Sequence, residues 1–146
     1  ENYARGSVAS VAVACHEAGH AVQTARGFAP IKIRTALVPV VNFASNAWFI
    51  ILIIGTSMSY MGLVRFAIIL YAATVIFQLV TLPVEIDASR RATVWLLRAG
   101  ITSASEQPMA VSALKSAAYT YVVAALSSLA TLAYYVMILV GGRSRD

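Results

Sequence analysis

The sequence contains few charged residues. Of its 146 residues, 12% are Asp, Glu, Lys or Arg, 60% are hydrophobic, and the mean hydropathy is +0.77. These values lie outside the range of soluble globular domains. A chain of this length also cannot surround several apolar helices with polar ones. The scarcity of charge therefore excludes an ordinary soluble fold and predicts an integral membrane protein.

Cysteine is nearly absent, and the one present, Cys15, excludes a disulfide within the chain. Helix geometry turns Cys15 about 100° away from its neighbour His16. We therefore expect Cys15 to be a small buried residue. The chain also begins at Glu1 without an initiator Met or a signal-like segment, so we expect that residues upstream, including a further span, have been removed.

Long uncharged runs occupy residues 35–64, 66–84 and 116–140. About 20 apolar residues cross the hydrocarbon core of a bilayer. The runs therefore predict three transmembrane helices near residues 37–56, 63–82 and 118–140, with a turn at 55–62. These spans contain almost no ionisable side chains, which a transporter would be expected to show.

The net charge of +5 does not indicate nucleic acid, because the basic residues lie beside the spans and form no patch with interleaved aromatic residues. Most of them fall on one side of the predicted spans, namely Arg26, Lys32, Arg34, Arg90, Arg91, Arg98 and Lys115. The positive-inside rule therefore predicts a protein of the inner (plasma) membrane with this side, and the active site, facing the cytoplasm. Arg65, Arg143 and Arg145 fall on the opposite side of the spans. Residues 31–34, which alternate apolar and basic, fit a basic anchor or an edge strand, and we favour the anchor.

The two histidines of the chain stand in the motif His16-Glu17-Ala18-Gly19-His20. Residues four apart share one face of a helix, so His16 and His20 can bind one metal ion. H-E-x-x-H on a helix is typical of a catalytic zinc site, in which the glutamate takes a proton from the zinc-bound water. The motif predicts Zn²⁺ at His16 and His20 and a general base at Glu17.

The helix that carries this motif has recognisable ends. Ser7 is a suitable N-cap, and Gly27 is suitable for the residue after the C-cap. The motif is flanked by uncharged, mostly apolar residues, as expected for a helix buried in a protein interior. A chance H-E-x-x-H in such an interior would leave unpaired His and Glu side chains at a considerable energetic cost.

A catalytic zinc usually has three protein ligands, and three acids remain as candidates: Glu85, Asp87 and Glu106. Glu106 lies in Ser103-Ala104-Ser105-Glu106, which has the pattern of a capping box. Asp87 is interpreted as a negative charge that stabilises a helix N-terminus, or as a residue that orients the metal ligands without binding the metal. Glu85 follows Pro83, where a new helix to residue 99 is expected to begin. We favour Glu85 as the ligand, because zinc peptidases with two His on one helix often take a Glu from a second helix.

Three segments, residues 7–23, 36–40 and 77–92, carry a resemblance to a known family. From Tyr3 to the third span, the chain resembles the bacterial neutral zinc metallopeptidases of the YugP-like membrane family. The resemblance implies that His16, His20 and Glu85 are the zinc ligands and Glu17 the base. It also implies an N-terminal span and a short domain that this chain does not contain.

The arrangement is similar to that of the membrane proteases that cleave prenylated CAAX proteins and of bacterial heat-shock membrane proteases. In those families an Asp follows the Glu ligand by four residues. This chain has Ser89 at that position, and Asp87 or Arg90 is a candidate for the role of the missing Asp.

Together these features predict an all-α integral membrane protein, with residues 1–146 forming a single membrane-embedded domain around a zinc site. The expected activity is that of a zinc metalloendopeptidase that cleaves proteins or peptides at the lipid bilayer. The alternative is an inactive or structural-zinc membrane protein that serves as a scaffold. The presence of Glu17 favours catalysis, because a structural zinc site requires no base.

Overall fold

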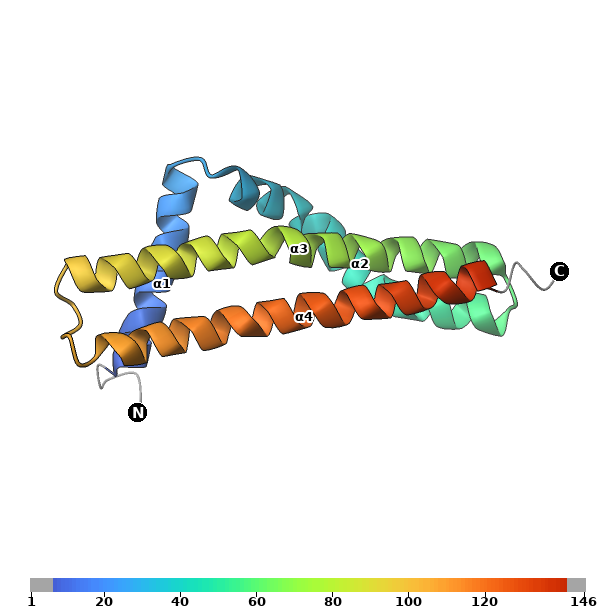
Figure 1. Cartoon of the computed structure of the whole chain (residues 1–146). Helices are drawn as coiled ribbons and strands as arrows, with labels where there is room; N and C mark the ends of the chain where they lie inside the picture. The colour runs from blue at the N-terminus through green and yellow to red at the C-terminus, as the bar shows by residue number, and fades with distance from the viewer. Residues whose placement is uncertain (1–6, 142–146) are drawn as a thin grey trace. The chain divides into compact units, whose positions relative to one another are not determined.

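The computed structural model describes residues 7–141, which form four α-helices and no β-strand (Figure 1). The helices are α1 (Val8–Ala25), α2 (Ala29–Ser57), α3 (Met61–Arg98) and α4 (Gln107–Gly141). The all-α prediction is confirmed. Residues 31–34 belong to α2, so the edge-strand alternative is wrong. Pro30 lies in the first turn of α2, where its missing N–H removes no intrahelical bond and the helix can continue.

The ends of α1 are those that the sequence predicts. The Ser7 hydroxyl accepts a hydrogen bond from the backbone N–H of Ser10 at 3.2 Å. After the C-cap, Gly27 has φ of +65°, and the N–H of Phe28 donates to the carbonyl of Gln23 at 2.9 Å. Glycine adopts this left-handed conformation without steric cost, which allows the helix to end there.

The segment before α4 contains the predicted capping box. The N–H of Ser103 donates to Glu106 Oε2 at 2.9 Å, and the N–H of Glu106 donates to Ser103 Oγ at 3.3 Å. The hydrogen bonds from the Ser103 hydroxyl and N–H lower the pKa of Glu106. Glu106 is therefore engaged at the start of α4, as expected.

Helices α2, α3 and α4 are each long and apolar enough to cross a membrane, with 29, 38 and 35 residues. The three predicted spans fall within these helices, and the predicted turn at 55–62 contains the end of α2 and the start of α3. Gly55 permits this tight turn, since a Cβ at this position would lie 2.9 Å from the backbone nitrogen of Val64.

The break expected at Pro83 does not occur, because α3 continues through Pro83 to Arg98. A proline inside a helix removes one backbone N–H donor and crowds the preceding turn. Pro83 is not followed by residues that favour a turn, so the other backbone hydrogen bonds of the long helix are kept. Glu85 therefore belongs to the same helix as the second predicted span.

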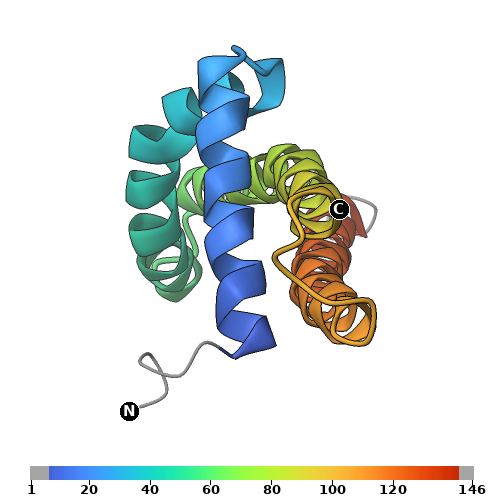
Figure 2. The same cartoon turned by 90° about the vertical axis from the view of Figure 1, so that its left-hand side faces the viewer.

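The helices divide into two compact units. The first contains residues 1–33 and 81–122, and in it α1 lies across α3 and α4 (Figure 2). Its core consists of Ala12, Cys15, Ala92, Leu96, Ala110 and Leu114. The second contains residues 34–80 and 123–146, in which the rings of Trp48, Tyr71 and Tyr135 are in contact.

Helix α1 is buried along one face only. The buried positions are Ala12, Cys15, Gly19 and Gln23, whereas Val13 is 57% exposed. The expectation that this helix is buried in a protein interior is therefore correct for one face and wrong for the opposite one. The physical reason is that α3 and α4 both pack against the same face of α1.

Candidate metal centre

The site is built where α1 crosses α3. Gly19 lies so close to Ala88 that a Cβ at this position would be 2.9 Å from the Ala88 carbonyl oxygen and 3.2 Å from the Ala88 Cα. Because both neighbouring atoms are backbone, no side chain can move aside to make room. Glycine between the two histidines is what allows α1 to approach α3 this closely.

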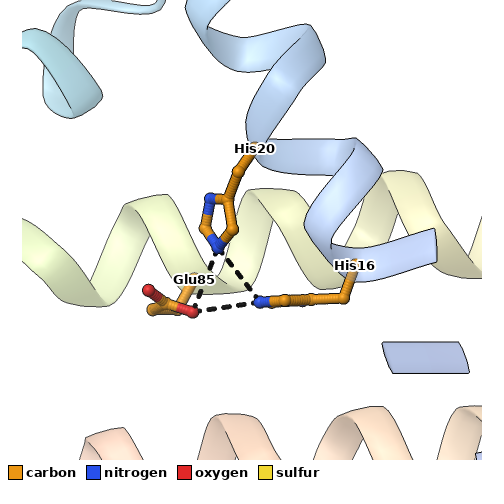
Figure 3. Close-up of side chains that lie close together, drawn as sticks. All are labelled: His16, His20 and Glu85. Atoms are coloured by element: carbon orange, nitrogen blue, oxygen red, sulfur yellow. Dashed lines mark hydrogen bonds and ion pairs between the residues drawn. The ribbon is translucent and has the colours of Figure 1, made fainter. Parts of the chain in front are cut away.

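This close approach brings His16 and His20 of α1 to Glu85 of α3 (Figure 3). The Nε2 atoms of the two histidines are 3.1 Å apart. Glu85 Oε2 lies 3.1 Å from Nε2 of His16 and 3.5 Å from Nε2 of His20. The Glu85 side chain is 3% exposed, and the two histidines are partly buried. A carboxylate and two imidazole nitrogens thus converge on one point.

The spacing of these atoms fits a zinc ion. Zinc binds His nitrogen and carboxylate oxygen at roughly 2.0–2.2 Å, so tetrahedral geometry requires ligand atoms about 3.3 Å apart. The three observed separations, 3.1, 3.1 and 3.5 Å, agree with that value. Two His and one Glu also form the donor set of catalytic zinc sites, which keep a fourth position open.

Gln23 determines which nitrogen of His20 faces this point. The Gln23 side-chain NH₂ donates to the Val84 carbonyl at 2.8 Å and to Asp87 Oδ2 at 2.9 Å. Both partners accept only, so the other atom of the amide, Oε1, must face His20 Nδ1, at 2.9 Å. Nδ1 of His20 therefore carries the proton, and the lone pair of Nε2 points towards His16 and Glu85.

Ser89 has the corresponding position beside the other histidine. Its hydroxyl lies 3.1 Å from Nδ1 of His16, where its oxygen can accept a hydrogen bond from Nδ1–H and leave the Nε2 lone pair free to bind a metal. Ser89 lies four residues after Glu85, the sequence position at which the similar membrane proteases have an Asp, and its hydroxyl contacts His16. Within residues 7–141, Arg90 forms no hydrogen bond with either histidine, whereas Asp87 accepts hydrogen bonds from Gln23 and from Arg91 Nε, the latter at 2.6 Å.

Gln23 and Ser89 were not predicted from the sequence as partners of the histidines. Gln23 could have been identified, since helix periodicity places it three residues from His20 on the same side of α1. The contact of Ser89 depends on the crossing of two helices and leaves no local signal. The predicted base, Glu17, is exposed on α1, and Cys15 is buried, which raises the pKa of its thiol.

Replacement of Gln23 by Leu is expected to weaken zinc binding about 10- to 100-fold, the usual effect of removing a partner that orients a ligand. The variant frees the His20 ring and leaves Asp87 without its amide donor. Competition with a chromogenic chelator measures the affinity. The control is Thr24→Val, because within residues 7–141 the Thr24 hydroxyl donates to the His20 carbonyl of its own helix and to no imidazole ring. Equal zinc affinity in Gln23→Leu and wild type would contradict the orienting role.

The sequence of this chain is similar to proteins of a known family. The family described as "Putative neutral zinc metallopeptidase" matches residues 1–140. The chain is 39% identical over 140 residues to the "Putative membrane protease YugP" of Bacillus subtilis (strain 168). The alignment covers 96% of this chain and 62% of that protein, so the chain spans less than two thirds of the length of this relative. No solved structure matches the chain.

Proposed function

The chain belongs to the neutral zinc metallopeptidase family, and from this premise we propose that it is a membrane-bound zinc endopeptidase. One observation supports the proposal above all others: two helices distant in sequence bring His16, His20 and Glu85 together with the spacing that zinc requires. The three residues would hold the ion. Gln23 and Ser89 would orient the two imidazole rings.

Zinc supplies a Lewis acid that polarises the peptide carbonyl and lowers the pKa of water. Glu17 follows His16 directly and is exposed, so substrate and water have access to its carboxylate. In the proposed reaction Glu17 accepts a proton as the water oxygen bonds to the carbonyl carbon. It then gives a proton to the leaving amine as the C–N bond breaks.

The substrate is a protein or peptide at the membrane surface. Glu85 comes directly after the uncharged residues 66–84 of α3, a segment of the right length to cross the hydrocarbon core. The site would thus lie close to the end of a span. The basic residues near this end support a position on the cytoplasmic side, by the positive-inside rule.

The alternative function, a scaffold with a structural zinc, would need a different donor set. Structural zinc sites are closed by four protein ligands. Among residues 7–141, the His, Cys, Asp and Glu side chains form one group with ligand atoms close enough for a metal ion, and it has three members. An open fourth position and an exposed Glu17 favour hydrolysis.

The experiment that tests the proposal is elemental analysis of the detergent-purified chain, followed by an assay of unfolded protein substrates. We expect one zinc per chain, loss of hydrolysis when a chelator removes it, and recovery when zinc is returned. Hydrolysis that persists in the metal-free protein would contradict the proposal. A folded chain that takes up no zinc at neutral pH would contradict it as well.

A further inference from the structure

A second surface feature lies between α3 and α4 and has no role in the proposed hydrolysis. It is a groove of about 320 Å³ with mainly apolar walls. The residues that line it are Ile86, Ser89, Arg90, Thr93, Val94, Val111, Leu114, Lys115 and Ala118. Ile86 and Val94 are 47% and 43% exposed, so the groove opens to the surroundings of the protein. We call it the α3–α4 groove.

Two cations stand in this groove, one from each helix. Arg90 and Lys115 are both exposed. Within the described residues 7–141, neither of them forms a salt bridge with a carboxylate. The walls of the groove contain no acidic side chain. Asp87, which is paired with Arg91, also attracts Arg90 but does not line the groove. An apolar groove with two positive charges and no acidic side chain in its walls is complementary to a molecule with an apolar chain and an anionic group.

The position of the two cations relative to the apolar segments indicates that this molecule is a membrane lipid. Lys115 directly precedes the uncharged residues 116–140 of α4, and Arg90 comes six residues after the uncharged residues 66–84 of α3. Six residues correspond to about 9 Å of helix, which is comparable to the headgroup layer on one side of a bilayer, roughly 5–8 Å. Both cations thus lie at or just beyond the ends of the apolar segments, within reach of lipid phosphates, if α3 and α4 cross the membrane.

We propose that the α3–α4 groove binds an anionic phospholipid, with the phosphate between Arg90 and Lys115 and an acyl chain along Ile86, Leu114 and Ala118. Basic pockets between transmembrane helices bind anionic headgroups in this way. The groove also has a link to the metal centre, because Ser89 lines it and contacts His16. A lipid in the groove would pack beside a residue that orients a zinc ligand.

The test is a titration of the detergent-solubilised chain with dioleoylphosphatidylglycerol or dioleoylphosphatidylcholine, followed by native mass spectrometry. Each basic side chain near an anionic lipid contributes roughly a fivefold factor in affinity, so we expect a preference of about 30-fold for phosphatidylglycerol. The double variant Arg90→Gln/Lys115→Gln should lose this preference and keep its zinc. Ala118→Trp should weaken binding of the lipid without any change of charge, because it fills the groove.

The matched control is Arg26→Gln/Arg65→Gln, which removes the same charge at exposed positions outside the groove and should retain the preference. An equal loss in this control would show that overall charge attracts the lipid and would overturn the proposal. Equal binding of the two lipids by wild type would overturn it too. Displacement of the lipid by millimolar inorganic phosphate would identify a site for free phosphate instead. If Ala118→Trp raised only the KM for peptide hydrolysis, the groove would hold substrate, which also contradicts the proposal.

Discussion

The variant Glu17→Gln is expected to lose peptide hydrolysis while it still binds one zinc per chain. A general base contributes about 10²- to 10⁴-fold to the rate, so kcat should fall by a factor of at least about 10². Glutamine has the shape of glutamate but cannot accept the proton. Zinc binding should persist because Glu17 is exposed and lies apart from the three converging donor atoms. Hydrolysis assays and elemental analysis on the same preparation measure both quantities.

A matched control for Glu17→Gln is Glu106→Gln, the same substitution at a partly exposed acid of the same unit, in the segment before α4. A glutamine at position 106 can still accept hydrogen bonds from Ser103, so hydrolysis should remain at the wild-type rate. Loss of zinc in Glu17→Gln would show that Glu17 holds the metal, and full activity would show that another group is the base. Either result would contradict the assigned role.

The variant Glu85→Ala is expected to lose zinc. Glu85 provides the only carboxylate within the donor group, and it is the only donor from α3. Loss of a partner that merely orients a ligand already costs about 10- to 100-fold in affinity, so loss of a ligand should weaken binding by more than about 100-fold. Zinc per chain should therefore fall from one to near zero in chelator-treated preparations, and hydrolysis should disappear with it.

The control for Glu85→Ala is Asp87→Asn, which neutralises the neighbouring acid on the same helix. Asp87 contacts Gln23 and Arg91 but neither histidine, so this variant should bind zinc more weakly than wild type and far more tightly than Glu85→Ala. Circular dichroism shows whether each variant keeps its helices. A folded Glu85→Ala that binds zinc as wild type does would exclude Glu85 as a ligand.

Local patterns in the sequence predicted much of the fold correctly. The ends of α1, the capping box before α4 and the three apolar helices each depend on residues that are neighbours in the chain. Such features follow from hydrogen bonds and hydropathy over a few turns, so tertiary contacts need not be known.

The prediction was wrong at Pro83 because local rules treat a proline as a helix boundary. In the structure the remaining backbone bonds of a 38-residue helix outweigh the one that is lost. The consequence for function is direct. Glu85 lies on the continuation of an apolar helix, so its position follows from how that helix packs and not from a new helix start.

The sequence by itself determined that two imidazoles and a neighbouring carboxylate share one helix, because the spacing of His16, Glu17 and His20 follows from 3.6 residues per turn. It did not determine which acid faces them, because Glu85 and Asp87 are two residues apart and point in directions about 160° apart around their helix. The tertiary structure decided this, where α1 crosses α3 at the contact of Gly19 with Ala88. At that crossing Glu85 contacts both histidines and Asp87 contacts Gln23, because the packing of the two helices decides which side chains of α3 reach the imidazole rings.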